Sequence, residues 1–142
     1  MATEPKTIYH ALSDFQQKVG KIAKDGKNPA FRSKYATLPG ILDAIQEPLR
    51  DCGLAFTQVP SGLGKLTTTV RHLPTGEEIS GTIEMVAPDS KPQTYGSLIT
   101  YQRRYALVAM LGLNVDEDDD GNAASGVKAK SASDDPVNGI PF

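Results

Sequence analysis

The sequence has a single cysteine, no tryptophan and no long apolar run. Cys52 cannot form an intramolecular disulfide and has no clustered ligand residues, which excludes a disulfide scaffold and a structural zinc site. A reducing cytoplasm is the simplest location for such a chain. No stretch approaches the roughly 18 apolar residues of a membrane helix, and residues 1–5 lack the features of a signal peptide. We therefore expect a cytoplasmic protein without membrane association.

Features of common catalytic machinery are also scarce. Gly62 and Gly64 precede a predicted strand, and the following Lys65 lacks the glycine spacing and the Ser or Thr of a phosphate-binding loop. His10 and His72 fall in different predicted elements, without a nucleophile or a carboxylate relay, which favours surface or core-edge roles. We expect a protein that is not an enzyme and needs no cofactor.

The charge is divided unevenly along the 142 residues, which suffice for one domain. Lys and Arg number 15 and Asp and Glu 17, for a net charge of -2. Residues 1–113 hold 13 basic and 10 acidic side chains, whereas residues 114–142 hold two basic and seven acidic ones. The second segment has too few apolar residues to offset its ordering entropy. The sequence predicts a folded domain over 1–113 and a disordered acidic tail over 114–142.

The run of acids at 116–120 is the main candidate for a metal site. With Gly121 it matches the opening of a calcium loop, but position twelve is Val127 instead of a bidentate Glu. A nuclease-like magnesium site would need ligands on rigid elements, and this run begins the predicted tail. A solvated acidic linker is the favoured interpretation, so no bound metal is expected.

Two helices are predicted in the first third of the chain. Residues 7–24 carry one apolar stripe at helical spacing, and an exposed loop is expected over 28–36. A second helix is predicted over 38–52, with Thr37 as N-cap and Gly53 as its left-handed stop. Pro48 should kink that helix or end it early. The predicted core face of the second helix consists of Ile41, Leu42, Ile45 and Leu49.

In the middle of the chain, apolar and polar residues alternate with a period of two, which is typical of strands. Residues 54–59, 66–73 and 78–86 are predicted to form an antiparallel meander with one apolar face. A helix over 97–111 follows, with Ser97 as N-cap. The predicted fold class is α+β: a small antiparallel three-stranded sheet with helices packed on one face, a βββα core, followed by the acidic tail.

Apolar side chains surround the predicted helix 97–111. One stripe contains Tyr101 and Tyr105, while Leu107 and Leu111 lie on the opposite side. A helix with apolar side chains on opposite sides must be buried on both sides, by its own sheet and by a second element. We expect a neighbouring subunit to provide the second cover.

Cations and aromatic rings alternate in two segments, 31–35 and 101–105. Proteins that hold single strands combine charge along the phosphates with rings that stack on bases. The tyrosine pair at i, i+4 also fits simple core packing. Arg103 and Arg104 are the only charges on their helix, so they need an anionic partner, water, or a salt bridge to a carboxylate such as Glu84 or Asp43.

Three segments in order carry a resemblance to a known family. They are 28–38 (NPAFRSKYATL) with 41–45 (ILDAI), 96–107 (GSLITYQRRYAL), and the acids at 116–119. Over about residues 7–122 the chain resembles the ERF (essential recombination function) family of phage single-strand annealing proteins. The resemblance implies an ATP-independent annealing protein of the RecT-like superfamily, with a βββα core and ring or helical homo-oligomers that act on single-stranded DNA.

The same resemblance places Lys34, Tyr35, Arg103 and Arg104 within the functional motifs. Together with Arg32, which lies in the first cation and aromatic segment, they are the predicted DNA-binding residues. The implied role is homologous recombination and repair in the cytoplasm of a bacterial host cell. The alternative is a protein that protects single-stranded DNA without annealing it, although three strands are too few for the five of an OB barrel.

The last nine residues (DDPVNGIPF) are similar to the tip of bacterial single-stranded DNA-binding proteins. In such a tip a terminal Phe can fill an apolar pocket while nearby acids meet Lys or Arg on a partner. The resemblance implies host proteins that recognise those tips as partners. The predicted partner-binding residues are Asp134, Asp135, Ile140, Pro141 and Phe142.

Overall fold

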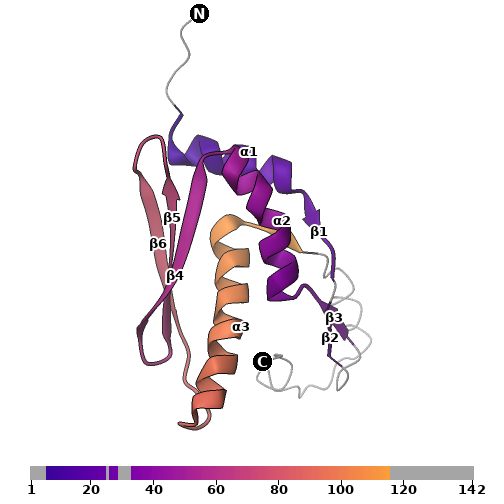
Figure 1. Cartoon of the computed structure of the whole chain (residues 1–142), viewed down its shortest axis with the longest axis vertical. Coiled ribbons are helices and arrows are strands. Elements are labelled where there is room, and N and C mark those ends of the chain that lie inside the picture. Colours follow the sequence, from indigo (N-terminus) through magenta and orange to yellow (C-terminus); the bar gives the residue numbers. More distant parts are fainter. Residues whose placement is uncertain (1–5, 25, 29–32, 116–142) are drawn as a thin grey trace, which may run out of the picture.

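The computed structural model describes residues 6–24, 26–28 and 33–115, with the backbone alone at 26–28, 33 and 34. In this part of the chain, three helices pack with a three-stranded sheet, and two pairs of short strands flank them (Figure 1). The helices are α1 (Ile8–Val19), α2 (Leu38–Asp51) and α3 (Pro92–Leu111). The strands are β1 (Lys21–Ile22), β2 (Gly26–Asn28), β3 (Ser33–Tyr35), β4 (Leu54–Gly62), β5 (Lys65–His72), β6 (Glu78–Glu84) and β7 (Asn114–Val115).

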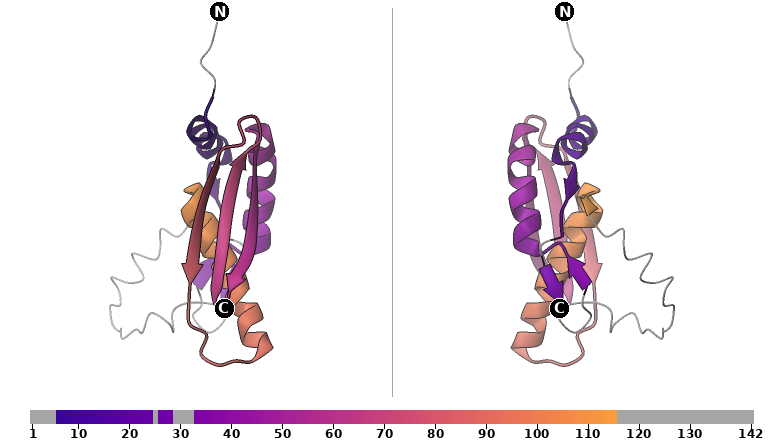
Figure 2. Two further views of the ribbon diagram at one scale, coloured as in Figure 1. Left: turned by 90° about the vertical axis from the view of Figure 1, so that its left-hand side faces the viewer. Right: turned by 90° about the vertical axis from the view of Figure 1, so that its right-hand side faces the viewer.

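The sheet has the order β4-β5-β6 with both pairings antiparallel, as the meander prediction requires. On the central strand, Leu66 and Val70 are buried in the core, and Thr67 and Thr69 lie on the outer face. The helices cover the inner face only, so the outer face lies open in the side view (Figure 2). The predicted α+β class and the one-sided packing are confirmed.

Helix α1 begins where the sequence predicts but ends earlier. The Thr7 hydroxyl accepts a hydrogen bond from the His10 amide and caps the helix. Gly20 ends it at a φ of 63°, a conformation that favours glycine. The predicted helix over 7–24 is therefore too long. Ile22, expected on its apolar stripe, is instead buried from β1, which pairs in parallel with β7.

Helix α2 follows its prediction closely. The Thr37 hydroxyl accepts a hydrogen bond from the Gly40 amide at 3.1 Å and caps the helix. Ile41, Ile45 and Leu49 are buried against the core, and Leu42 is partly buried. The helix continues through Pro48 to Asp51, so an early end at that proline is wrong. The burial of Leu49, one residue further on, favours this continuation.

Helix α3 starts five residues before the predicted Ser97 cap. Pro92 occupies the first turn, where its missing N–H costs no helical hydrogen bond. Before it, an Asp89 carboxylate oxygen accepts hydrogen bonds from the Lys91 amide and the Thr94 hydroxyl. These bonds lower the pKa of Asp89 and hold the N-cap residue Lys91 and the first turn of the helix in place.

The side of α3 that carries Leu107 and Leu111 is buried by other elements of the same chain. Leu107 and Leu111 are fully buried in one cluster with Phe15 of α1 and with Ile41 and Ile45 of α2. The expectation that a neighbouring subunit covers this side of the helix is therefore wrong. The reason is that α1 and α2 lie close to the C-terminal part of α3, where Leu107 and Leu111 join their apolar residues in the core (Figure 1).

The fold extends two residues beyond the predicted boundary at 113. Leu113 is buried, and Asn114 and Val115 form β7 beside β1. The remaining part of the predicted tail, 116–142, lies outside the described residues. None of the helices in the described ranges is both long and apolar enough to cross a membrane.

Candidate nucleic-acid interface

An arginine and three tyrosine rings form the centre of the candidate site. The guanidinium carbon of Arg104 lies 4.8 Å from the ring centroid of Tyr35, 5.7 Å from that of Tyr101 and 5.4 Å from that of Tyr105. All three distances fall within the range of cation–π attraction. We call these four residues the cation–aromatic cluster. It joins β3 to α3, and so brings the two predicted cation and aromatic segments together.

The two tyrosines of α3 differ in exposure. Tyr101 is 4% exposed and Tyr105 42%, although their ring centroids lie 4.3 Å apart at an interplanar angle of 56°. Burial raises the pKa of the Tyr101 phenol far above its usual range, and the charge of Arg104 opposes that shift. Core packing is thus confirmed for Tyr101 and wrong for Tyr105, whose ring offers an accessible stacking surface.

Arg103 lies on the sheet side of the same helix. Its Nε donates a hydrogen bond to the Gln58 side-chain oxygen at 3.1 Å. The Gln58 amide nitrogen donates in turn to the Arg103 carbonyl at 3.2 Å and to the Thr68 hydroxyl at 3.0 Å. This described partner is a neutral amide instead of the carboxylates considered from the sequence. It uses one of the five guanidinium N–H groups and leaves the positive charge unneutralised.

Gln102, the residue before the two arginines, fixes the helix to the β4–β5 turn. Its buried side chain donates to the Gly64 carbonyl at 2.7 Å. Gly64 has a φ of 72°, and a Cβ there would lie 2.3 Å from the Met85 carbonyl oxygen. The glycine pair that could suggest a phosphate loop thus lies at the β4–β5 hairpin, where Gly64 is required by its backbone.

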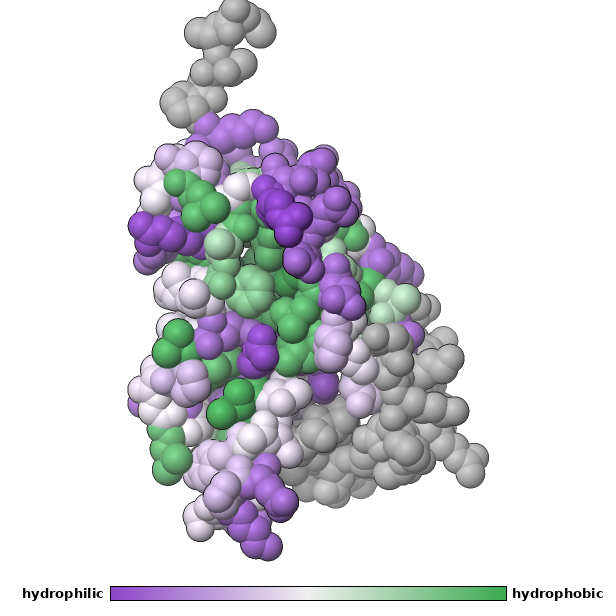
Figure 3. Space-filling model, in the orientation of Figure 1, coloured by the Kyte–Doolittle hydropathy of each residue, from purple (hydrophilic) through white to green (hydrophobic). Residues whose placement is uncertain are grey.

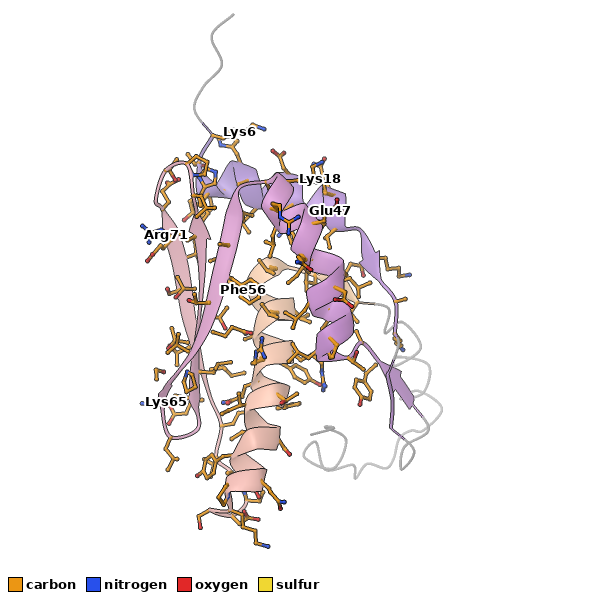
Figure 4. All side chains as sticks on the ribbon, in the orientation of Figure 1. Lys6, Lys18, Glu47, Phe56, Lys65 and Arg71 are labelled. Carbon is orange, nitrogen blue, oxygen red and sulfur yellow. The ribbon has the colours of Figure 1, made fainter. Side chains whose placement is uncertain are left out.

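The sequence pattern does not identify Gln58 or Gln102 as parts of the site. Gln102 lies inside the segment that resembles the family motif, where the cations and rings carry the pattern. The alternation along β4 gives a signal for Gln58, since it lies on the same inward face as Leu54 and Phe56. The Phe56 side chain points from β4 toward the helices in Figure 4, and Gln58 follows it on that face.

The first motif segment is only partly described. Lys34 lies in β3 opposite Lys27 of β2 in an antiparallel hairpin. The end of the predicted exposed loop is packed, because Tyr35 is partly buried and Ala36 is buried. Arg32 and the predicted partner-binding residues Asp134, Asp135, Ile140, Pro141 and Phe142 lie outside the described residues.

The two histidines have structural roles. The buried His72 contacts the Thr75 hydroxyl through Nδ1 at 2.9 Å, and His10 takes part in the capping box of α1. Both fit the core-edge and surface roles expected for them. Within residues 6–24, 26–28 and 33–115, no group of three or more His, Cys, Asp or Glu could hold a metal ion. The acidic run at 116–120 lies outside this range.

The fold and the cluster define an α+β domain with an open three-stranded sheet and an arginine held among tyrosine rings. A sequence model of the ERF superfamily matches residues 8–138. The chain therefore belongs to the ERF superfamily. Membership connects it with phage recombination by single-strand annealing. The comparisons with curated proteins and with solved structures each returned no significant match.

Proposed function

We propose that the chain binds single-stranded DNA across the cation–aromatic cluster and anneals complementary strands without ATP. The observation that carries this proposal is the contact of Arg104 with Tyr35. This contact supports the proposal because it joins β3 to α3, where the Arg104 guanidinium lies beside the accessible ring of Tyr105. Bases stack on such rings whatever their sequence, because every base has a π face.

The two arginines take different roles in this proposal. Arg103 is half-buried, and four of its guanidinium N–H groups are not used by the Gln58 bond, so it is the phosphate contact. Arg104 is 9% exposed and acts from within the cluster, where its charge holds the three rings together. Arg32 and Lys34, the other cations predicted from the sequence, are proposed as further phosphate contacts. Tyr35 and Tyr105 supply the rings.

Annealing in this proposal breaks no covalent bond and needs no cofactor. The protein holds one strand extended and lets a complementary strand pair with it. Because one subunit offers few nucleotides of track, we propose that the chain acts as a homo-oligomer, as a ring or a helical filament. Acids and the apolar tip at 134–142 are proposed to bind host proteins that recognise tails of single-stranded DNA-binding proteins, in the cytoplasm of a bacterial host cell.

A groove between α2 and β4 is the surface proposed for contact with a second copy. Its volume is about 390 Å³, and its lining includes Leu42, Leu49, Phe56 and Leu73. It coincides with apolar surface at the centre of the face in Figure 3. Strand β4 has no second strand neighbour among the described residues. An apolar groove beside an open strand edge is a typical association surface.

The experiment that tests the proposed function mixes two complementary labelled strands with the protein, with and without ATP and magnesium. Duplex formation and strand length are followed together. We expect faster annealing in all conditions and no shortening of the strands. A protein that binds single strands but slows their pairing would be a protecting protein instead. Shortening that depends on magnesium would indicate a nuclease.

A further inference from the structure

A small cleft adjoins the cation–aromatic cluster on the side of Tyr105. It lies between α3 and β6, has a volume of about 260 Å³ and is mostly apolar. This α3–β6 cleft is lined by Thr68, Gly81, Thr82, Ile83, Tyr105, Ala106, Ala109 and Met110. Three of these residues are glycine or alanine, so the space exists because side chains are small where the helix faces the strand.

Strand β6 brings free backbone groups to the edge of this cleft. The Met85 amide donates to the Gly64 carbonyl, and the His72 amide donates to the Glu77 carbonyl. Along an antiparallel pair, residues that hydrogen-bond to the neighbouring strand alternate with residues that do not. Gly81 and Ile83 therefore also bond to β5, whereas the N–H and C=O of Thr82 point away from it. In the part of the chain that the structure describes, no other strand pairs with that edge.

We propose that the α3–β6 cleft holds one nucleobase of the bound strand, stacked against the Tyr105 ring. This inference rests on the proposed function, since it assumes that DNA crosses the cation–aromatic cluster. Tyr105 lines the cleft, and its ring centroid lies 5.4 Å from the guanidinium carbon of Arg104. A strand that crosses the cluster therefore passes the opening of the cleft.

The size and chemistry of the cleft fit a single base. Its volume lies below the roughly 300–1,000 Å³ of pockets that enclose drug-sized ligands, so one planar ring system is the suitable occupant. Ile83 and Met110 supply apolar contact for its faces. The Thr82 backbone offers one donor and one acceptor, which every base can match along its edge. The cleft should therefore hold a base without strong sequence preference.

The test compares binding of an oligo-dT with binding of an abasic oligomer of the same length and charge. Ala109 is exposed, and Ala109→Leu fills the cleft from the helix. Ser97→Leu places the same side chain at an exposed position of α3 outside the cleft and is the control. We expect Ala109→Leu to weaken oligo-dT binding at least about five-fold, the loss of one stacked base. Binding of the abasic oligomer should not change.

A second pair of variants tests the strand edge independently. Thr82→Pro removes an N–H that no ladder bond uses, a substitution that edge strands accept. Ser80→Pro makes the same change two residues away, outside the cleft, and each variant loses one hydroxyl contact to β5. Thr82→Pro should weaken oligo-dT binding about 2- to 10-fold, the loss of one hydrogen bond, and Ser80→Pro should not.

Three results would overturn the inference. One is equal affinity of the unmodified protein for both oligomers, which would leave phosphate binding intact but exclude a held base. Another is that the folded Ala109→Leu and Thr82→Pro variants bind oligo-dT as tightly as the unmodified protein. The cleft would then hold a protein side chain or no ligand. Failure of the unmodified protein to bind either oligomer would overturn the proposed function itself.

Discussion

The guanidinium of Arg104 lies 4.8 Å from the ring centroid of Tyr35, so a buried charge on α3 is held by a ring from the β2–β3 hairpin. This contact brings together the two segments of the sequence in which cations and aromatic rings alternate. The hairpin supplies a ring, and the helix supplies a cation and two further rings. Neither segment forms the cluster alone.

Replacement of Tyr35 tests the role of its ring. Tyr35→Leu should weaken single-strand binding by about 1–3 kcal/mol, because a stacking surface is lost. Tyr35→Phe should bind nearly as the unmodified protein, because the ring and its attraction for Arg104 remain. Fluorescence anisotropy with a labelled oligo-dT measures both. A severe loss in a folded Tyr35→Phe variant would indicate a hydroxyl hydrogen bond instead of stacking.

The two arginines should differ in the salt dependence of binding. Arg103→Ala removes a phosphate contact, so the slope of log K against log salt should fall by roughly 0.7 on single strands. Arg104→Ala disorders the rings and should weaken binding with a smaller change in that slope. Titrations over a range of salt concentrations separate the two. Equal slopes for Arg103→Ala and the unmodified protein would assign Arg103 a structural role.

Gln58 should act on DNA binding through Arg103. Its side chain accepts from the Arg103 Nε and donates to the Arg103 carbonyl, so Gln58→Leu frees the guanidinium to adopt other rotamers. The variant should weaken binding, and the effect should disappear in an Arg103→Ala background, which a double-mutant cycle measures. Fully additive effects would show that Gln58 contributes independently.

The groove between α2 and β4 should govern self-association. Leu73 lies in its lining and is 61% exposed, so Leu73→Glu places a charge in the proposed interface without disturbing the core. Leu63→Glu makes the same change at a leucine that is 78% exposed in the β4–β5 turn and is the control. Sedimentation velocity should show smaller particles for Leu73→Glu alone. Equal sizes for both variants and the unmodified protein would place the interface elsewhere.

Acid should destabilise the contact between α1 and the β5–β6 turn. Glu77 accepts hydrogen bonds from the Ile8 amide at 2.8 Å and from the Thr75 hydroxyl, and these bonds lower its pKa. A lowered pKa means that the carboxylate stabilises the fold above the pKa of the unfolded chain, and that this contribution is lost as the pH falls through the folded pKa.

Thermal unfolding between about pH 7 and pH 3 measures this contribution. The difference in Tm between the unmodified protein and Glu77→Gln should be largest at neutral pH and shrink in acid. Glu47→Gln, on the surface of α2, is the control (Figure 4). A difference in Tm that is constant over the whole range would show that ionisation of Glu77 does not matter.

Local patterns predicted most of the fold. Thr37, Gly53 and the alternation on β5 indicated helix and strand limits because caps, turns and period-two burial act over a few residues. The errors came from long-range contacts. Ile22 continued a helical stripe in sequence, yet Gly20 ends the helix and β7 pairs with β1. Leu107 and Leu111 suggested a partner subunit because periodicity cannot show that α1 and α2 cover them.

The candidate site could be predicted by its residue types but not by its geometry. The segment 101–105 indicated cations beside rings, and the structure shows that Arg104 is enclosed by rings while Arg103 bonds to an amide on β4. Spacing on one helix could not assign these different environments. The contrast between Tyr101 and Tyr105 depends equally on neighbours that are distant in sequence.

Photochemical cross-linking tests the central claim most directly. An oligo-dT with 5-bromodeoxyuridine at single positions is irradiated in complex with the full chain, and the attached residues are identified by mass spectrometry. The account predicts cross-links to Tyr35 and Tyr105, both of which lose efficiency in Arg103→Ala at moderate salt. Cross-links confined to the outer face of the sheet, around Thr67 and Thr69, would contradict it.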